Sequence, residues 1–173
     1  MAIIREIRGF RPTFGDNCWL AETAVVLGEV ELGEDCTVWY NAVVRGDVNY
    51  IRVGDRTNIQ DNVTIHGTYE KAPTNIGNDV SIGHNAVIHG CTIEDEVLIG
   101  IGAIVLDGAV VKTGAIVAAG AVVLAGTVVE GGWIYGGIPA KKLKPVEGKN
   151  REMQSRIAKN YIKYAGWFKN DSK

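Results

Sequence analysis

Aliphatic residues recur at every sixth position over a long stretch of this chain. Between residues 93 and 134 the sequence divides into blocks of six: IEDEVL, IGIGAI, VLDGAV, VKTGAI, VAAGAV, VLAGTV and VEGGWI. Each block opens with Ile or Val, and most have Gly at the fourth place. An amphipathic helix would repeat near 3.6 residues and a half-buried strand near two. A period of six instead predicts an all-β solenoid of the parallel β-helix type.

A β-sandwich is the main alternative for a chain that is rich in Val and Gly. Sandwich strands are separated by polar turn clusters every 8–12 residues. The sequence contains few such clusters. The six-residue period therefore favours the β-helix.

A second pattern begins after residue 146. Residues 147–168, EGKNREMQSRIAKNYIKYAGWF, lack the six-residue period and are strongly charged. Their large apolar and aromatic side chains follow helical spacing at Met153, Ile157, Tyr161 and Tyr164. We therefore divide the chain into a β-helix domain, residues 1–146, and a C-terminal α-helix, residues 147–173. This helix is expected to pack along the β-helix or on a neighbouring subunit.

The six-residue blocks resemble those of the hexapeptide-repeat, left-handed β-helix proteins. The resemblance covers about residues 26–140 and persists through more than a dozen blocks. In that family three blocks form one triangular coil. The resemblance therefore implies a left-handed prism with three faces.

Counting the blocks assigns the earlier part of the chain to these faces. The block-opening residues are six apart, except for longer steps from Val44 to Val53 and from Ile65 to Ile76. We interpret the extra residues, approximately YIR and KAPTN, as loops at corners. With the faces named A, B and C, the opening residues are assigned as follows: Val53 and Ile76 to face A, Ile59 and Ile82 to face B, and Val44, Ile65 and Ile88 to face C.

The three histidines of the chain take defined places on these faces. His66 and His89 are both second in their blocks on face C, one coil apart. Because stacked strands lie about 4.8 Å apart, these two imidazoles can bind one metal ion. His84 is third in its block on face B and points around a corner, away from that pair. The three histidines would meet between two subunits, and a ring of subunits closes such a contact.

Other polar residues fall at the same height of the prism. Arg45 is second in its block on face C, one coil before His66, and Asp47 lies on the same strand. Asp61 is one coil before His84 on face B, with Gln60 beside it. A solvated face or a salt bridge at an oligomer interface is the alternative interpretation, and it stays open here.

Composition and charge exclude several classes of protein. The 173 residues carry a formal charge of −2, so a basic surface for nucleic acid is not expected. No apolar run reaches the roughly 18 residues of a membrane span. Arginines interrupt the N-terminus where a signal peptide would be apolar, and the three cysteines lack metal or redox spacing. We expect a cytoplasmic protein with no nucleic-acid or membrane partner.

Three stretches sharpen the resemblance to the γ-class carbonic anhydrase-like proteins: VVRGDVNYIRVG, NIQDNVTIHG and IGHNAVIHGCTI. The resemblance implies a homotrimer that hydrates CO₂ to bicarbonate reversibly. The residues that match the family's metal ligands are His66, His84 and His89. The residues that match its further catalytic positions are Arg45, Asp47, Gln60 and Asp61.

This ligand set suits a catalytic metal. Three neutral imidazoles leave a divalent ion an open position, and the ion can lower the pKa of a bound water to about 7. By resemblance, Gln60 would orient the resulting hydroxide or the substrate, and Asp61 would accept the second ring proton of a ligand histidine. Zinc is the expected cofactor, and imidazole sites also accept Fe²⁺ or Co²⁺.

The chain departs from the family in its proton path. Well-characterised members carry glutamates that move the proton to buffer, whereas this chain has Val48 after Asp47 and a short loop after His66 with Glu70 as its only carboxylate. Glu70 and Tyr161 are the candidate replacements. Weak activity is therefore expected. The alternatives are a hexapeptide acyltransferase, which transfers acyl groups with one base histidine, and a metal-binding trimer with little or no carbonic anhydrase activity.

Overall fold

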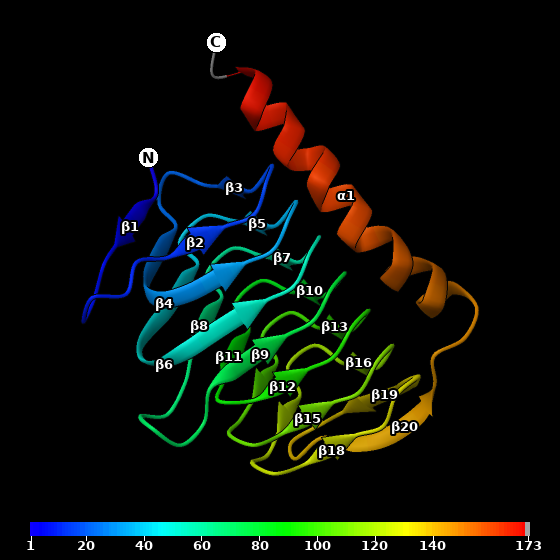
Figure 1. Cartoon of the computed structure of the whole chain (residues 1–173). Coiled ribbons are helices and arrows are strands. Elements are labelled where there is room, and N and C mark those ends of the chain that lie inside the picture. Colours follow the sequence, from blue (N-terminus) through cyan, green and yellow to red (C-terminus); the bar gives the residue numbers. More distant parts are fainter. Residues whose placement is uncertain (172–173) are drawn as a thin grey trace.

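The chain forms a left-handed parallel β-helix of about seven coils, followed by one α-helix (Figure 1). The computed structural model describes residues 1–171, without the side chains of Ser155, Asn170 and Asp171. The last two residues of the expected helix segment lie outside this range. The fold predicted from the six-residue period is confirmed.

The strands stack into three faces, which keep the names given above. Face C contains β1 (Ile3–Arg5), β4 (Val25–Leu32), β6 (Val43–Val53), β8 (Thr64–His66), β11 (Val87–His89), β14 (Ile104–Val105) and β17 (Val122–Val123). Face A contains β2 (Thr13–Phe14), the second halves of β4 and β6, β9 (Thr74–Ile76), β12 (Thr92–Ile93), β15 (Val110–Val111) and β18 (Val128–Val129). Face B contains β3 (Trp19–Leu20), β5 (Thr37–Val38), β7 (Asn58–Ile59), β10 (Ser81–Ile82), β13 (Leu98–Ile99), β16 (Ile116–Val117), β19 (Trp133–Gly136) and β20 (Lys141–Pro145).

The strand register confirms the assignment of blocks to faces. Val53 pairs with Ile76 on face A, and Ile59 pairs with Ile82 on face B. On face C the pairing of β8 with β11 places His66 opposite His89. Block counting along the sequence therefore gave the correct stacking of the two histidines.

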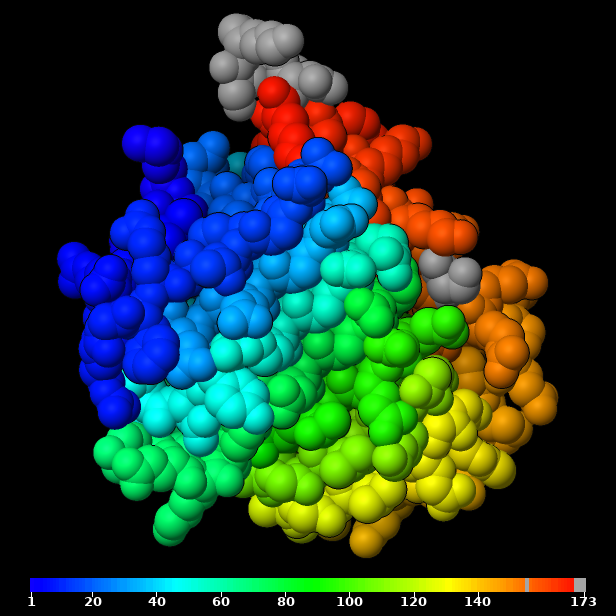
Figure 2. All heavy atoms as spheres, viewed as in Figure 1, coloured from blue at the N-terminus to red at the C-terminus, as the bar shows by residue number. Residues whose placement is uncertain are grey.

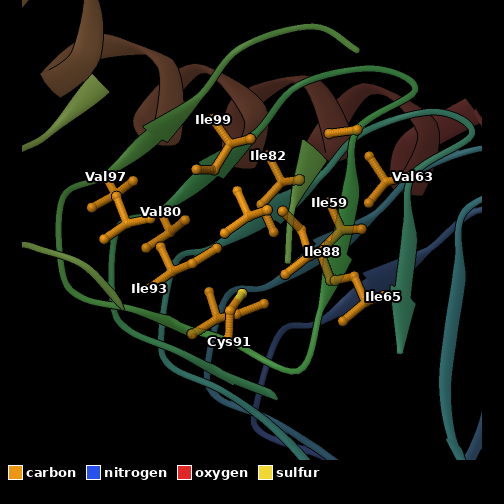
Figure 3. Close-up of a cluster of buried hydrophobic side chains, with 14 of the residues drawn as sticks. Ile59, Val63, Ile65, Val80, Ile82, Ile88, Cys91, Ile93, Val97 and Ile99 are labelled. Carbon is orange, nitrogen blue, oxygen red and sulfur yellow. The ribbon is translucent and has the colours of Figure 1, made fainter. Parts of the chain in front are cut away.

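The block-opening residues fill the centre of the prism. Figure 3 shows several of them, including Ile59, Ile65, Ile82 and Ile88, gathered inside the coil, and none of these four is exposed to solvent. Burial of a branched aliphatic side chain contributes roughly 1.5–3 kcal/mol. Because every coil adds one such residue per face, the core continues along the whole prism.

Two details of the sequence interpretation are wrong. The extra residues of the first long step lie within residues 47–50, which include only Tyr50 of YIR, because Ile51 and Arg52 pair in register with β4. Thr74 and Asn75 of the proposed KAPTN loop belong to β9, so the second insertion occupies residues 67–73 and protrudes as a loop between β8 and β9 (Figure 1). Both insertions lie at the corner between faces C and A.

The β-helix also begins earlier than the visible repeats. Strand β1 pairs with β4, and β2 pairs with β4 one corner further on, so residues 3–20 form a complete first coil. In Figure 2 the colours follow one another in bands from this coil to the last. Large insertions in the first coil, such as the turn in which Ile7 and Phe10 pair, hide its period.

Helix α1 (Lys149–Asp171) lies along face B (Figure 1). Near its start, Ile157 packs against an apolar group formed by Leu98, Ile116, Ile134 and Val146. Further along, the helix contacts β5, β7 and β10. In the described part of the chain, no helix is long and apolar enough to cross a membrane.

Candidate metal centre

Strands β8 and β11 hold two imidazoles side by side on face C. Nδ1 of His66 lies 3.2 Å from Nε2 of His89. Two nitrogen ligands bound to one tetrahedral zinc, each about 2.0–2.1 Å from it, are about 3.3 Å apart. The spacing of these two nitrogens therefore fits two ligands of a single metal ion.

His84 occupies a different place, at the corner that follows β10. Its side chain is 38% exposed, against 16% for His66. Among residues 1–171 with described side chains, no group of three His, Cys, Asp or Glu residues is close enough to hold a metal ion. One chain thus supplies a pair of imidazoles and, separately, a third that faces outward.

Each histidine is held by a carboxylate of its own. Asp47 Oδ1 lies 3.0 Å from His66 Nε2, and Asp61 Oδ2 lies 2.8 Å from His84 Nδ1. Metal-bound histidines in proteins almost always donate their second ring N–H in this way. The donor set therefore fits a divalent metal bound by neutral imidazoles.

A third carboxylate belongs to Asp107, which sequence reasoning missed. Its Oδ1 lies 2.5 Å from His89 Nδ1, and its Oδ2 accepts a hydrogen bond from the Thr68 hydroxyl. Asp107 lies in the block VLDGAV, where an acidic residue before glycine is typical of a turn. Asp107 lies one coil after Gly90, the neighbour of His89. That position was the only sign in the sequence that Asp107 could contact His89.

Arg45 and Asp47 form an ion pair beside His66. Arg45 Nη1 lies 2.6 Å from Asp47 Oδ2. Burial alone would raise the pKa of the Asp47 carboxyl, but the hydrogen bonds from Arg45 and His66 outweigh it and hold that pKa below its ordinary value. Asp47 is therefore ionised at neutral pH and accepts a hydrogen bond from the imidazole N–H.

The protonation of His66 also suits a metal ligand. Burial lowers its pKa, and the positive charge of Arg45 acts in the same direction, while the hydrogen bond to Asp47 opposes them. The net pKa lies below the ordinary value. The imidazole is thus neutral at physiological pH and keeps a lone pair for a metal.

Burial similarly affects Asp107. Burial alone would raise its pKa, but the hydrogen bonds from Thr68 and His89 outweigh that effect and lower the pKa. The carboxyl stays charged and acts as an acceptor.

Gln60 lies in a buried polar network beneath α1 and is 5% exposed. Its amide donates to Asn58 Oδ1 at 3.0 Å, and its carbonyl oxygen accepts from the backbone N–H of His84 at 3.2 Å. Asn58 in turn donates to Ser81 Oγ at 2.8 Å. Within one chain, Gln60 therefore holds the backbone at His84.

The two candidate proton carriers, Tyr161 and Glu70, lie near different corners of the β-helix. Tyr161 extends from α1 to His84, with its hydroxyl 3.4 Å from Nε2. Burial, followed by the charge of Asp61, raises the pKa of Tyr161 to about 12, so it remains protonated at neutral pH. Glu70 is exposed in the loop of residues 67–73.

Comparison with known proteins identifies relatives of this chain. Residues 11–46 match the bacterial transferase hexapeptide (six repeats) family. The protein YrdA of Escherichia coli is 41% identical over 94% of this chain and 91% of its own length. A carbonic anhydrase of Geobacillus kaustophilus is 38% identical over 96% of this chain and 91% of its own length.

Two further relatives have names that point to different activities. The mitochondrial γ carbonic anhydrase 3 of Arabidopsis thaliana is 50% identical over 89% of this chain and 62% of its own length. The crystal structure of a hexapeptide transferase family protein from Anaplasma phagocytophilum is 34% identical over 96% of this chain and 98% of its own length, with a TM-score of 0.92. Taken with the paired imidazoles and their carboxylates, these likenesses lead to one assignment: the chain belongs to the γ-class carbonic anhydrase-like family of hexapeptide-repeat proteins.

Proposed function

We propose that the protein is a carbonic anhydrase-like metalloenzyme that hydrates CO₂ to bicarbonate reversibly at sites between the subunits of a homotrimer. The metal is zinc, with Fe²⁺ or Co²⁺ as alternatives. The ligands are His66 and His89 of one subunit and His84 of the next. Relatives named carbonic anhydrases support the small-molecule substrate and a metal cofactor.

One observation carries this proposal. Two imidazole nitrogens lie 3.2 Å apart, while the third histidine of the chain lies at another corner, with its side chain 38% exposed. A tetrahedral catalytic site needs three protein ligands and one open position. The chain provides the three ligands in two separate places, so the site is complete only when a second copy adds His84.

The surface beside the ligands supports contact between copies. Ile101 follows His84 by one coil at the same corner and is 56% exposed. Leu124 on face C, two coils after His89, is 48% exposed. Exposed apolar side chains on the two surfaces that must meet favour association. Three copies close such a head-to-tail contact into a ring.

The chain's own residues prepare this site. A divalent metal bound there lowers the pKa of its water ligand and supplies hydroxide at neutral pH. Asp47 fixes the ring of His66, and Arg45 holds Asp47 in place. Asp61 fixes the ring of His84, and Gln60 holds the backbone at His84. By its likeness to the family, Gln60 would also orient CO₂ or the nucleophile.

Mixing two inactive variants tests the arrangement between subunits. His84→Ala and the double variant His66→Ala/His89→Ala each lack ligands at every interface and should be metal-free as pure trimers. In any mixed trimer, one interface joins an intact His84 to an intact pair. Co-expressed trimers should therefore regain about one metal ion per trimer. Mixed trimers that stay empty would contradict the proposal.

Stopped-flow CO₂ hydration on protein of known metal content then separates the enzyme from a metal-binding trimer with little activity. Activity that follows metal content and disappears in His89→Ala supports the enzyme. Metal-loaded trimers no faster than buffer would favour the inactive alternative.

A transferase remains a second candidate because of the likeness to the Anaplasma phagocytophilum protein. A transferase of this kind needs one base histidine and no bound metal. Release of free coenzyme A from acetyl coenzyme A by metal-free protein, in the presence of amine or alcohol acceptors, would favour it over the lyase.

A further inference from the structure

Asp107 lies at the corner between faces C and A, one coil beyond the strand that carries His89. Its two carboxylate oxygens have different partners. Oδ1 lies 2.5 Å from Nδ1 of His89, and Oδ2 accepts a hydrogen bond from the hydroxyl of Thr68. One side chain therefore joins a candidate metal ligand to the loop of residues 67–73.

Gly90 makes this contact possible. Gly90 stands directly before Asp107 in the corner stack, where the N–H of Gly108 donates to the carbonyl of Gly90 at 2.7 Å. A Cβ atom on Gly90 would lie 2.7 Å from Asp107 Oδ1, and its φ of +55° is a conformation that favours glycine. The absence of a side chain at residue 90 lets the carboxylate reach back to His89.

The loop is fastened at the same place. Thr68 lies at its base, where its N–H donates to the carbonyl of Ala72 at 2.9 Å. Thr74, at the other end, donates its hydroxyl hydrogen to the carbonyl of His66 at 2.6 Å and accepts from the N–H of Gly90 at 3.0 Å. Thr74 thus ties one end of the loop to His66 and to the residue after His89, while Thr68 ties the other end to Asp107.

Two other acidic residues at corners, Asp55 and Asp95, have a structural role. Asp55 accepts the backbone N–H of Glu34 at 2.9 Å, and Asp95 accepts that of Asn78 at 2.7 Å. These carboxylates satisfy the turn of the preceding coil. Asp107 instead directs both oxygens at side chains, which a turn alone does not require.

We propose that Asp107 is a positioning residue that fixes the ring orientation and tautomer of His89 and couples both to the loop of residues 67–73. This inference rests on the proposed function, because His89 is taken as a metal ligand. A carboxylate that accepts a hydrogen bond from the Nδ1–H group leaves the Nε2 lone pair for the metal. That nitrogen is the one that faces His66.

The first experiment measures metal affinity by competition with a chelator. Asp107→Asn should bind Zn²⁺ about 10–100-fold more weakly than wild type, the usual effect of changing such a partner. The matched control is Asp95→Asn, which removes the same charge from another corner and should bind as wild type does. If wild type binds zinc and Asp107→Asn binds it equally well, the proposal is overturned.

Thr68→Val tests the connection to the loop. It removes the hydroxyl and keeps the shape, so the affinity should fall by less than in Asp107→Asn. In the double variant the two effects should not add, because Thr68 acts through Asp107. Full additivity would overturn the coupling.

The second experiment needs no metal. The protein has only three histidines, so nitrogen-15 NMR can resolve their ring nitrogens in the metal-free protein. The single ring proton of neutral His89 should be found on Nδ1. Asp107→Ala, with its fold checked by circular dichroism, should shift that proton toward Nε2, and Asp95→Ala should not. An unchanged tautomer would overturn the proposal. A wild type that binds no metal would overturn the proposed function alone, since this measurement still decides whether Asp107 fixes His89.

Discussion

The same column of face C carries imidazoles in two central coils of the β-helix and leucines in the two coils that follow. His66 and His89 follow the inward residues Ile65 and Ile88, and Leu106 follows the inward residue Val105 in the next coil. The backbone pairing does not change across this boundary. The inward positions maintain the fold, so the outward position beside them is free to carry chemistry.

The residue type at one corner also differs between the coils with histidines and the coils with leucines. At the corner between faces B and C, Asn62 and Asn85 adopt φ values of +59° and +60°, while Gly102 and Gly120 adopt +66° and +65°. Asn tolerates this conformation and Gly accepts it without cost. Coils with the polar site thus use Asn where the apolar coils use Gly.

The largest expected effect is a loss of bound metal when a histidine of this face C column is replaced by alanine. His89→Ala should lose nearly all bound metal, because a site with two remaining ligands no longer matches the three that a catalytic zinc requires. Leu106→Ala, in the next coil of the same column, should keep it. Elemental analysis of both purified proteins gives the answer, and metal retained in His89→Ala would place the site elsewhere.

A smaller effect is expected from the inward positions. Ile88 is fully buried, and Ile88→Ala should reduce the free energy of unfolding by about 2–5 kcal/mol. Val128 is 54% exposed on face A, and Val128→Ala should change it by less than about 0.5 kcal/mol. Chemical denaturation compares the two. Equal losses of unfolding free energy would contradict the argument that the inward residues, and not the outward ones, maintain the fold.

The smallest effect is expected at the corners. Among the described residues, apart from Gly120 and its two chain neighbours, no heavy atom lies within 4 Å of a Cβ built on Gly120. Gly120→Ala should therefore cost only the strain of a left-handed residue, about 1–2 kcal/mol. Gly120→Asn should cost less, because Asn85 already adopts this conformation. Thermal unfolding of both variants measures the difference, and an Asn variant less stable than the Ala variant would refute the argument.

Much of this arrangement was readable from the sequence because the six-residue period places inward residues directly. The pairing of His66 with His89 followed from counting alone. The first coil escaped detection because its insertions hide the period. Asp107 escaped because an Asp–Gly pair is ordinary turn chemistry, and only the packing against Gly90 shows where the carboxylate points. The hydrogen bonds of Gln60 to Asn58 and to the backbone of His84 depend on side-chain direction, which the six-residue period does not describe.

The end of the β-helix bears on polymerisation. An open parallel sheet offers unpaired edge groups to another chain and so can grow into fibres. Here β20 pairs antiparallel with β19, which closes face B, and Val122 of β17 exchanges backbone hydrogen bonds with Gly137 and Ala140, which closes face C. Strand β18, the last strand of face A, pairs only with β15 among the described strands. The lysines of β20 (Lys141, Lys142 and Lys144) add like charge at the closed end, so stacking of one β-helix on another is discouraged there.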